Sequence, residues 1–543
     1  MQNGRGLPAT TRSLYRAIQD GAIWTPEYHR AFLQETGERD AQTGTDTKPE
    51  IEAEAIVNAL LGRAFDDYGG RLQVDHRGLR ITGARIIGEL NLTAIRFEWP
   101  IWLTKCKFDL PITLTDARLG RVVLDGSSFP SMDAENVRID GDFSLCGLDA
   151  VHIGLRGARI TGLLDLQGAK LNAANQELGG LGAIYCNSAI IDGSVFMRDN
   201  FSAQGEVNFV GATIGGSLEC YDGAFSNPHG GALDCNGATI KESVFLRNGS
   251  KVQGEVNFVG ATIGGALDCS EGAFSNPGGM ALNCNGATIK RSAFLRNGCS
   301  VEGHVNFVGA TVGGDLDCID GAFSNLEGVA LQCSGITVDE TVFLSDGFRA
   351  KGEVSFVAAT IGSVLECSGG VFFNPDGVAL DFSNASIDGS AYMRADFRAK
   401  GEVSLISATI KGSLQFWNAR LDGGSGIALD LDGATIGDTL LLARLTSDGE
   451  APPAGRIILR DVRAHLLADD GSAWKGKSRK GELILDGLTY ERFTDIFDTP
   501  IKRNTDWRFR LTGSRASRNT ILRKIFVRSP GASAPESCAP WDT

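Results

Sequence analysis

The chain has 543 residues, of which 70 are glycine, a larger share than the average of about 7%. With 42% hydrophobic residues, 22% charged residues and a net charge of -14, the chain can bury a large core, which excludes a disordered or collagen-like protein. Because a single compact core stops growing at about 250 to 300 residues, the length predicts several domains or one solenoid.

The N-terminal region carries apolar side chains at helical spacing in two segments, residues 11 to 36 and 50 to 64. A solenoid exposes unpaired strand edges at its ends, and helices are a common cover for such edges. We therefore expect residues 1 to 65 to form a small α-helical cap. The first residues lack an apolar secretory signal, and no run approaches the roughly 18 apolar residues of a membrane helix, so we expect a cytoplasmic protein.

An internal repeat dominates the rest of the sequence. The phrase GEVNFVGATIGG begins at Gly205 and recurs, with small changes, every 49 residues up to Gly401. GATI occurs twice in the first units, which divides 49 residues into coils of 26 and 23. Short alternating apolar runs between glycines predict four short strands per coil. We expect a β-solenoid over residues 66 to 445, strict from residue 205, and degenerate terminal coils over residues 446 to 495.

The A-T-I and A-L-D-C phrases at steps of five to six residues resemble pentapeptide-repeat proteins. That resemblance implies an all-β fold, a right-handed parallel β-helix with four sides. The six-residue steps and the inserted loop at residues 226 to 231 depart from a strict five, so a three-sided β-helix stays open. The pattern, closing in GELILDGLTYERF from Gly481, is also similar to a group of bacterial proteins often labelled membrane-associated oxidoreductases.

Motifs for catalysis or cofactor binding are missing from the sequence. The six histidines form no HExxH motif or zinc-type pair, and neither GxSxG, GxGxxG before a helix nor GxxxxGK[ST] occurs. We therefore expect no catalytic, metal or cofactor site, and no sequence motif supports the oxidoreductase label. Cysteines recur 49 residues apart at inward positions such as Cys220 and Cys269, which predicts small core residues without disulfides.

Outward positions also repeat, and a solenoid keeps its binding function there. One set is a candidate acidic face: Glu219, Asp268, Asp317 and Glu366. A second set combines outward aromatic rings with arginines, a composition typical of recognition surfaces. This candidate binding surface comprises Phe196, Phe245, Phe294, Phe343, Tyr392, Arg198, Arg247, Arg296 and Arg394.

The C-terminal segment, residues 496 to 543, has the opposite charge. Its basic side chains could contact nucleic acid, an anionic surface or the protein's own acidic columns. The candidate residues are Arg508, Arg510, Arg515, Arg518, Arg523 and Lys524.

These features together predict a non-enzymatic binding or scaffold protein that recognises a protein partner or a second copy of itself. Two alternatives stay open. One is an acidic mimic of DNA that inhibits a DNA-binding enzyme such as a topoisomerase, as the resemblance to pentapeptide-repeat proteins implies. The other is a β-helix enzyme acting on polysaccharides, because Asp and Glu occur on every coil.

Overall fold

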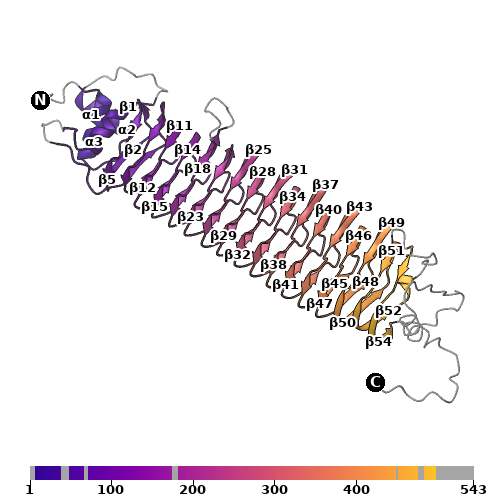
Figure 1. Cartoon of the computed structure of the whole chain (residues 1–543). Helices are drawn as coiled ribbons and strands as arrows, with labels where there is room; N and C mark the ends of the chain where they lie inside the picture. The colour runs from indigo at the N-terminus through magenta and orange to yellow at the C-terminus, as the bar shows by residue number, and fades with distance from the viewer. Residues whose placement is uncertain are drawn as a thin grey trace, which may run out of the picture. The chain divides into compact units, whose positions relative to one another are not determined.

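The computed structural model describes residues 7 to 37, 48 to 65, 71 to 173, 182 to 447, 451 to 474 and 482 to 496. The chain divides into two compact units. Unit 1 comprises Met1–Asp317 and Gly321–Asn325, and unit 2 comprises Cys318–Asp320 and Leu326–Thr543. In each unit, short strands stack in parallel on the strands of the neighbouring coil, so both units are β-solenoids (Figure 1).

One double coil of unit 1 shows how the repeat builds four sides. It contains β22 (Val207–Asn208), β23 (Thr213–Ile214), β24 (Leu218–Glu219), β25 (Ala224–Asp234), β26 (Thr239–Ile240), β27 (Val244–Phe245) and β28 (Lys251–Asn257). We number the four faces of a coil in chain order, beginning with the face of β24. β24 pairs with β27 on face 1, and β23 pairs with β26 on face 4. The first and last thirds of β25 pair with β28 on faces 2 and 3. Each coil therefore has four sides.

The predicted coil lengths are confirmed by the register on face 4. Ile214 lies opposite Ile240, 26 residues on, and Ile240 lies opposite Ile263, 23 residues on. The longer coil contains the inserted loop, where the register of β25 shifts between Ser226 and Gly231. The Asn227 side chain closes this loop by donating a hydrogen bond of 2.9 Å to the Gly231 carbonyl oxygen. An Asn at this turn position replaces a backbone hydrogen-bond donor, as Asn commonly does in turns.

The core consists of inward side chains from all four faces. Ile214, Leu218, Phe225 and Leu233 are 0 to 1% exposed, and alternate residues on the same strands point outward. Side chains of successive coils stack in register, because each strand pairs with the next at the same position. Aromatic contacts in the core include Phe201 with Phe225, whose rings are tilted by 43° and have centroids 5.3 Å apart.

Three α-helices in the described part of the chain precede the first complete coil: α1 (Ala9–Gln19), α2 (Pro26–Thr36) and α3 (Ala53–Leu60). Between α1 and α2, the Trp24 amide donates to the Arg80 carbonyl oxygen at 2.9 Å, beside β2 (Leu79–Thr82). Residues 50 to 52 are not helical as expected; they form strand β1 (Glu50–Glu52), parallel to β3 (Arg85–Ile87). The reason is that β3 would otherwise leave its backbone edge unpaired.

At the other end of the described chain, unit 2 closes with less regular coils. β50 (Thr435–Ala443) pairs with β52 (Arg463–Asp469), which pairs with β54 (Thr489–Asp495). None of the helices in the described ranges has the length and apolarity that a membrane span requires.

Candidate functional site: an aromatic column

An aromatic side chain points outward from face 1 on every second coil of the strict repeat. On β27, Val244 is fully buried, and so is Leu246 just after the strand, whereas Phe245 between them keeps part of its ring exposed. This is the orientation that the repeat pattern predicts, because alternate residues of a strand face opposite sides. We call these residues the aromatic column: Phe196, Phe245 and Phe294 in unit 1, and Phe343 and Tyr392 in unit 2.

Carboxylates alternate with the rings of the aromatic column. In unit 1, Phe245 lies in register between Glu219 and Asp268, and Phe294 lies between Asp268 and Asp317. In unit 2, Glu366 lies between Phe343 and Tyr392. The candidate acidic face and the candidate binding surface are therefore one continuous feature within each unit.

An arginine two residues after each ring, except at Phe343, stacks its guanidinium over that ring. The guanidinium carbon lies 4.3 Å from the ring centroid for Arg198 on Phe196, 4.7 Å for Arg247 on Phe245, 4.2 Å for Arg296 on Phe294 and 3.8 Å for Arg394 on Tyr392. These distances are within the usual range of about 6 Å for cation–π contacts. After Phe343 the chain has the buried Ser345 in place of arginine.

Each of these arginines also forms an ion pair with a carboxylate of the column. In unit 1 the acid lies on the following coil: Arg198 with Glu219 at 2.7 Å, Arg247 with Asp268 at 3.2 Å and Arg296 with Asp317 at 2.7 Å. In unit 2, Arg394 contacts Glu366 on the preceding coil at 3.3 Å. The four carboxylates are largely shielded, with only 6% of the Asp317 side chain exposed. The column therefore presents rings and neutralised pairs, not a row of unpaired negative charge.

A second repeated position lies at the corner where every second coil enters face 3. It holds Glu206, Glu255, His304, Glu353 and Glu402. Burial raises the pKa of Glu206, Glu353 and Glu402, and nearby aspartates add to the rise. Burial lowers the pKa of His304, whose Nε2 is buried and has no hydrogen-bond partner among the described residues. A recurring half-buried acid of this kind costs stability at neutral pH.

The cysteines of the strict repeat lie in the core, as their inward positions predict. Cys220, Cys235, Cys269 and Cys284 are fully buried and form no disulfide among the described residues. Burial raises the pKa of each of these thiols, so the reactive thiolate is disfavoured. Their environment is that of small apolar core residues.

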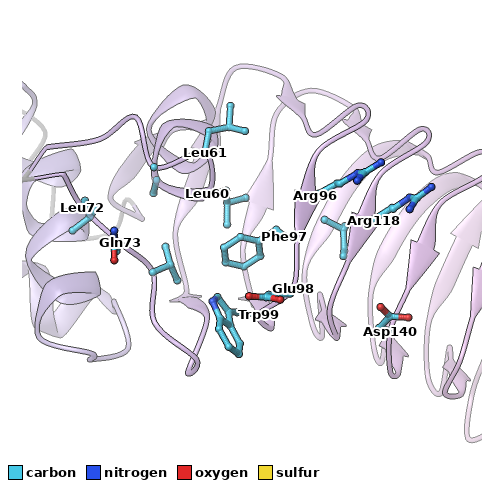
Figure 2. Close-up of a pocket in the computed structure, with 14 residues that line it drawn as sticks. Leu60, Leu61, Leu72, Gln73, Arg96, Phe97, Glu98, Trp99, Arg118 and Asp140 are labelled. Atoms are coloured by element: carbon cyan, nitrogen blue, oxygen red, sulfur yellow. The ribbon is translucent and has the colours of Figure 1, made fainter.

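A pocket that the sequence pattern does not predict lies where the helical cap meets face 4 of unit 1. Its volume is about 490 Å³, and Figure 2 shows Leu60, Phe97 and Trp99 along one side, with Arg96 and Arg118 on adjacent strands beside them. The signal for these arginines is present in the sequence, because Arg precedes the inward residue in IRF, ARL, VRI and ARI of four successive coils. The four arginines are 22, 20 and 21 residues apart, so they do not form a repeat of fixed period.

The basic C-terminal residues, Arg508 to Lys524, lie outside the described residues. Within the described ranges, no group of three or more His, Cys, Asp or Glu side chains is arranged to hold a metal ion. Comparison of the chain with known protein families, with curated proteins and with solved structures finds no match.

Proposed function

We propose that the chain is a non-enzymatic binding protein that uses its β-solenoid units as a scaffold and docks a partner protein on rings of the aromatic column. The observation that carries the proposal is the placement of Phe245 and Phe294. Both rings lie outward, in register and between fully buried neighbours. A surface made only for solvation would place charged or polar residues at these positions.

The arginines support a binding role because they are already fixed in position. Arg247 and Arg296 each lie against a ring on one side and a carboxylate on another, and about 40% of each side chain stays accessible. Ordered arginines and aromatic rings lose little conformational entropy when a partner binds, and these residue types dominate binding energy at protein interfaces. Burying one phenylalanine side chain contributes about 1.5 to 3 kcal/mol, so several aligned rings can supply much of an interface.

The test replaces Phe245, Phe294 and Phe343 by serine in the full chain. We expect β-rich circular dichroism to persist, while a partner captured by the wild type from cells of the native host no longer binds. The wild-type complex should also be reconstituted from the purified partner, with affinity measured for both forms. Light scattering of the purified chain distinguishes a partner protein from self-association.

A matched control replaces Thr239, Thr288 and Thr337 by serine, on face 4 of the same three coils. These threonines also point outward but carry no aromatic ring, so their replacement should leave partner binding intact. An unfolded phenylalanine variant would show that the rings belong to the core. A folded variant with unchanged partner binding would overturn the proposed docking surface.

A further inference from the structure

Four arginines occupy one outward position of face 4 on consecutive coils of unit 1. They lie on β5 (Arg96–Phe97), β9 (Arg118–Leu119), β12 (Arg138–Ile139) and β15 (Arg159–Ile160). The strands pair in parallel so that each arginine lies opposite the next. All four side chains are exposed, and the residue after each one is buried. We call Arg96, Arg118, Arg138 and Arg159 the arginine ladder.

The guanidinium groups of the arginine ladder do not contact a carboxylate within the described part of the chain. None of the four forms an ion pair there, although Arg121 nearby pairs with Asp142. Like charges at neighbouring positions on adjacent strands, about 4.8 Å apart, repel one another and destabilise a sheet. Further along unit 1 the same position holds Ile190 and then threonines from Thr213 onward. The ladder therefore departs from the chain's own pattern at a cost to stability.

The pocket described above adjoins the first two rungs of the ladder. Figure 2 shows Arg96 and Arg118 side by side and pointing in the same direction, and Phe97 and Trp99 line the same pocket on the side that faces the helical cap. Trp99 is 36% exposed, and Leu60 and Leu72 complete an apolar wall. Gln73 and the carboxylates of Glu98 and Asp140 supply polar groups at the pocket lining. A flat aromatic group would find both a ring to stack on and hydrogen-bonding partners here.

We propose that the arginine ladder binds the phosphate backbone of a single-stranded nucleic acid and that the adjoining pocket receives one of its bases. Guanidinium groups bind phosphate through paired hydrogen bonds, and a line of four along the coils suits a linear chain of anions. Proteins that bind single strands combine such a basic track with aromatic side chains on which bases stack. This function uses face 4 and is independent of the aromatic column on face 1.

The combination of a line of charge with an aromatic pocket selects this occupant over other polyanions. A polyphosphate chain would use the guanidinium groups and leave the apolar pocket without a role. The net charge of -14 opposes nucleic-acid binding over the whole surface, so the interaction is local to the ladder. Screening over about 8 to 10 Å at ordinary salt concentrations limits the influence of distant carboxylates.

The experiment measures binding of a fluorescently labelled oligodeoxythymidylate to the full chain by anisotropy over a range of salt concentrations. The test variant replaces all four ladder arginines by glutamine. We expect its affinity to fall about tenfold or more and its salt dependence to flatten, by about 0.7 in log–log slope for each lost phosphate contact. Removing mutual repulsion should leave its melting temperature unchanged or higher, so loss of binding will not reflect unfolding.

Two matched variants locate the binding. One replaces four exposed basic residues of unit 2, Arg349, Lys351, Arg398 and Lys400, by glutamine, and should keep the wild-type affinity. The other neutralises the six candidate basic residues between Arg508 and Lys524, and should keep the ladder-dependent part of binding. If the ladder variant binds as tightly as the wild type, or if only the C-terminal variant loses binding, the proposal is wrong.

The pocket and the class of polymer are tested with two further probes. Wild type should prefer the oligodeoxythymidylate over an abasic strand of the same length, and Trp99→Ala should abolish that preference while keeping most of the phosphate-dependent binding. Equal binding of both strands by the wild type would contradict the role of the pocket. Ladder-dependent binding of polyphosphate or heparin, without binding of the oligonucleotide, would overturn the assignment to nucleic acid.

Discussion

Arg296 and Asp317 form an ion pair across two coils of unit 1, with 2.7 Å between the guanidinium Nη1 and the carboxylate Oδ2. The aspartate side chain is 6% exposed, whereas 39% of the arginine side chain is accessible. A nearly buried carboxylate depends on its partner, because desolvation without a neighbouring cation is costly. The pair therefore links an outward, repeated surface feature to the stability of the solenoid.

Replacing Arg296 by methionine should destabilise the protein, because the substitution removes the positive charge that pairs with Asp317. Methionine keeps the apolar part of the side chain, so packing is largely retained. We expect a loss of about 1 kcal/mol in the free energy of unfolding, since the arginine side of the pair is partly solvated. Urea denaturation followed by circular dichroism measures the change. Arg291→Met on the same coil, at an exposed position, is the control and should cost much less. Equal losses in both variants would contradict the importance of the pair.

Replacing Glu402 by glutamine should stabilise the protein at neutral pH. Burial raises the pKa of Glu402, and the charges of Asp430 and Asp381 raise it further. Between the unfolded pKa and this higher folded pKa, the folded protein binds more protons, so stability falls as pH rises through that interval. The benefit of glutamine should therefore be present at pH 7 and disappear below the unfolded pKa of about 4.3.

Thermal denaturation over a pH series measures this dependence for wild type, Glu402→Gln and the exposed control Glu271→Gln. The control should show no comparable gain at neutral pH. A stabilisation by Glu402→Gln that is equal at all pH values would show that the effect comes from packing and not from the carboxylate charge.

Thiol reactivity should distinguish the folded from the unfolded chain. Burial raises the pKa of Cys299 to about 12, and the fully buried thiols of the repeat are also inaccessible to reagents. We expect slow reaction with an aromatic disulfide reagent in buffer and reaction of nearly all twelve cysteines in denaturant without reductant. Two or more cysteines that stay unreactive in denaturant would indicate disulfides and contradict their placement as separate core residues.

Loss of the helical cap should make unit 1 associate through its exposed edge. Trp24 is 0% exposed, and its indole Nε1 donates a 3.0 Å hydrogen bond to Ser13 Oγ. We expect Trp24→Ala to cost about 3 to 5 kcal/mol within the cap. Deletion of residues 1 to 65 should then give oligomers or filaments in light scattering, because the backbone edges of β2 and β3 lose their partners. A monomeric deletion variant would argue against the capping role.

The sequence alone determines the coil of this protein. The repeat at Gly205 and Gly254 and the alternation around Ile214 predict the two coil lengths and the inward residues, and they favour four short strands per coil over three. These features are local, since strand geometry forces alternate residues to opposite sides, and glycine at corners such as Gly211 and Gly237 permits the positive φ of the turn.

Only the tertiary structure decided which outward residues meet. Arg247 reaches Asp268, 21 residues away, because β27 and β30 (Leu267–Asp268) pair in register, and Arg394 reaches back to Glu366 instead. Arg96 and Arg118 align because coils of unequal length still keep one strand position per face. Glu50 to Glu52 became a strand because an unpaired edge of β3 was available. Contacts between coils depend on backbone pairing across the stack, which local sequence patterns do not specify.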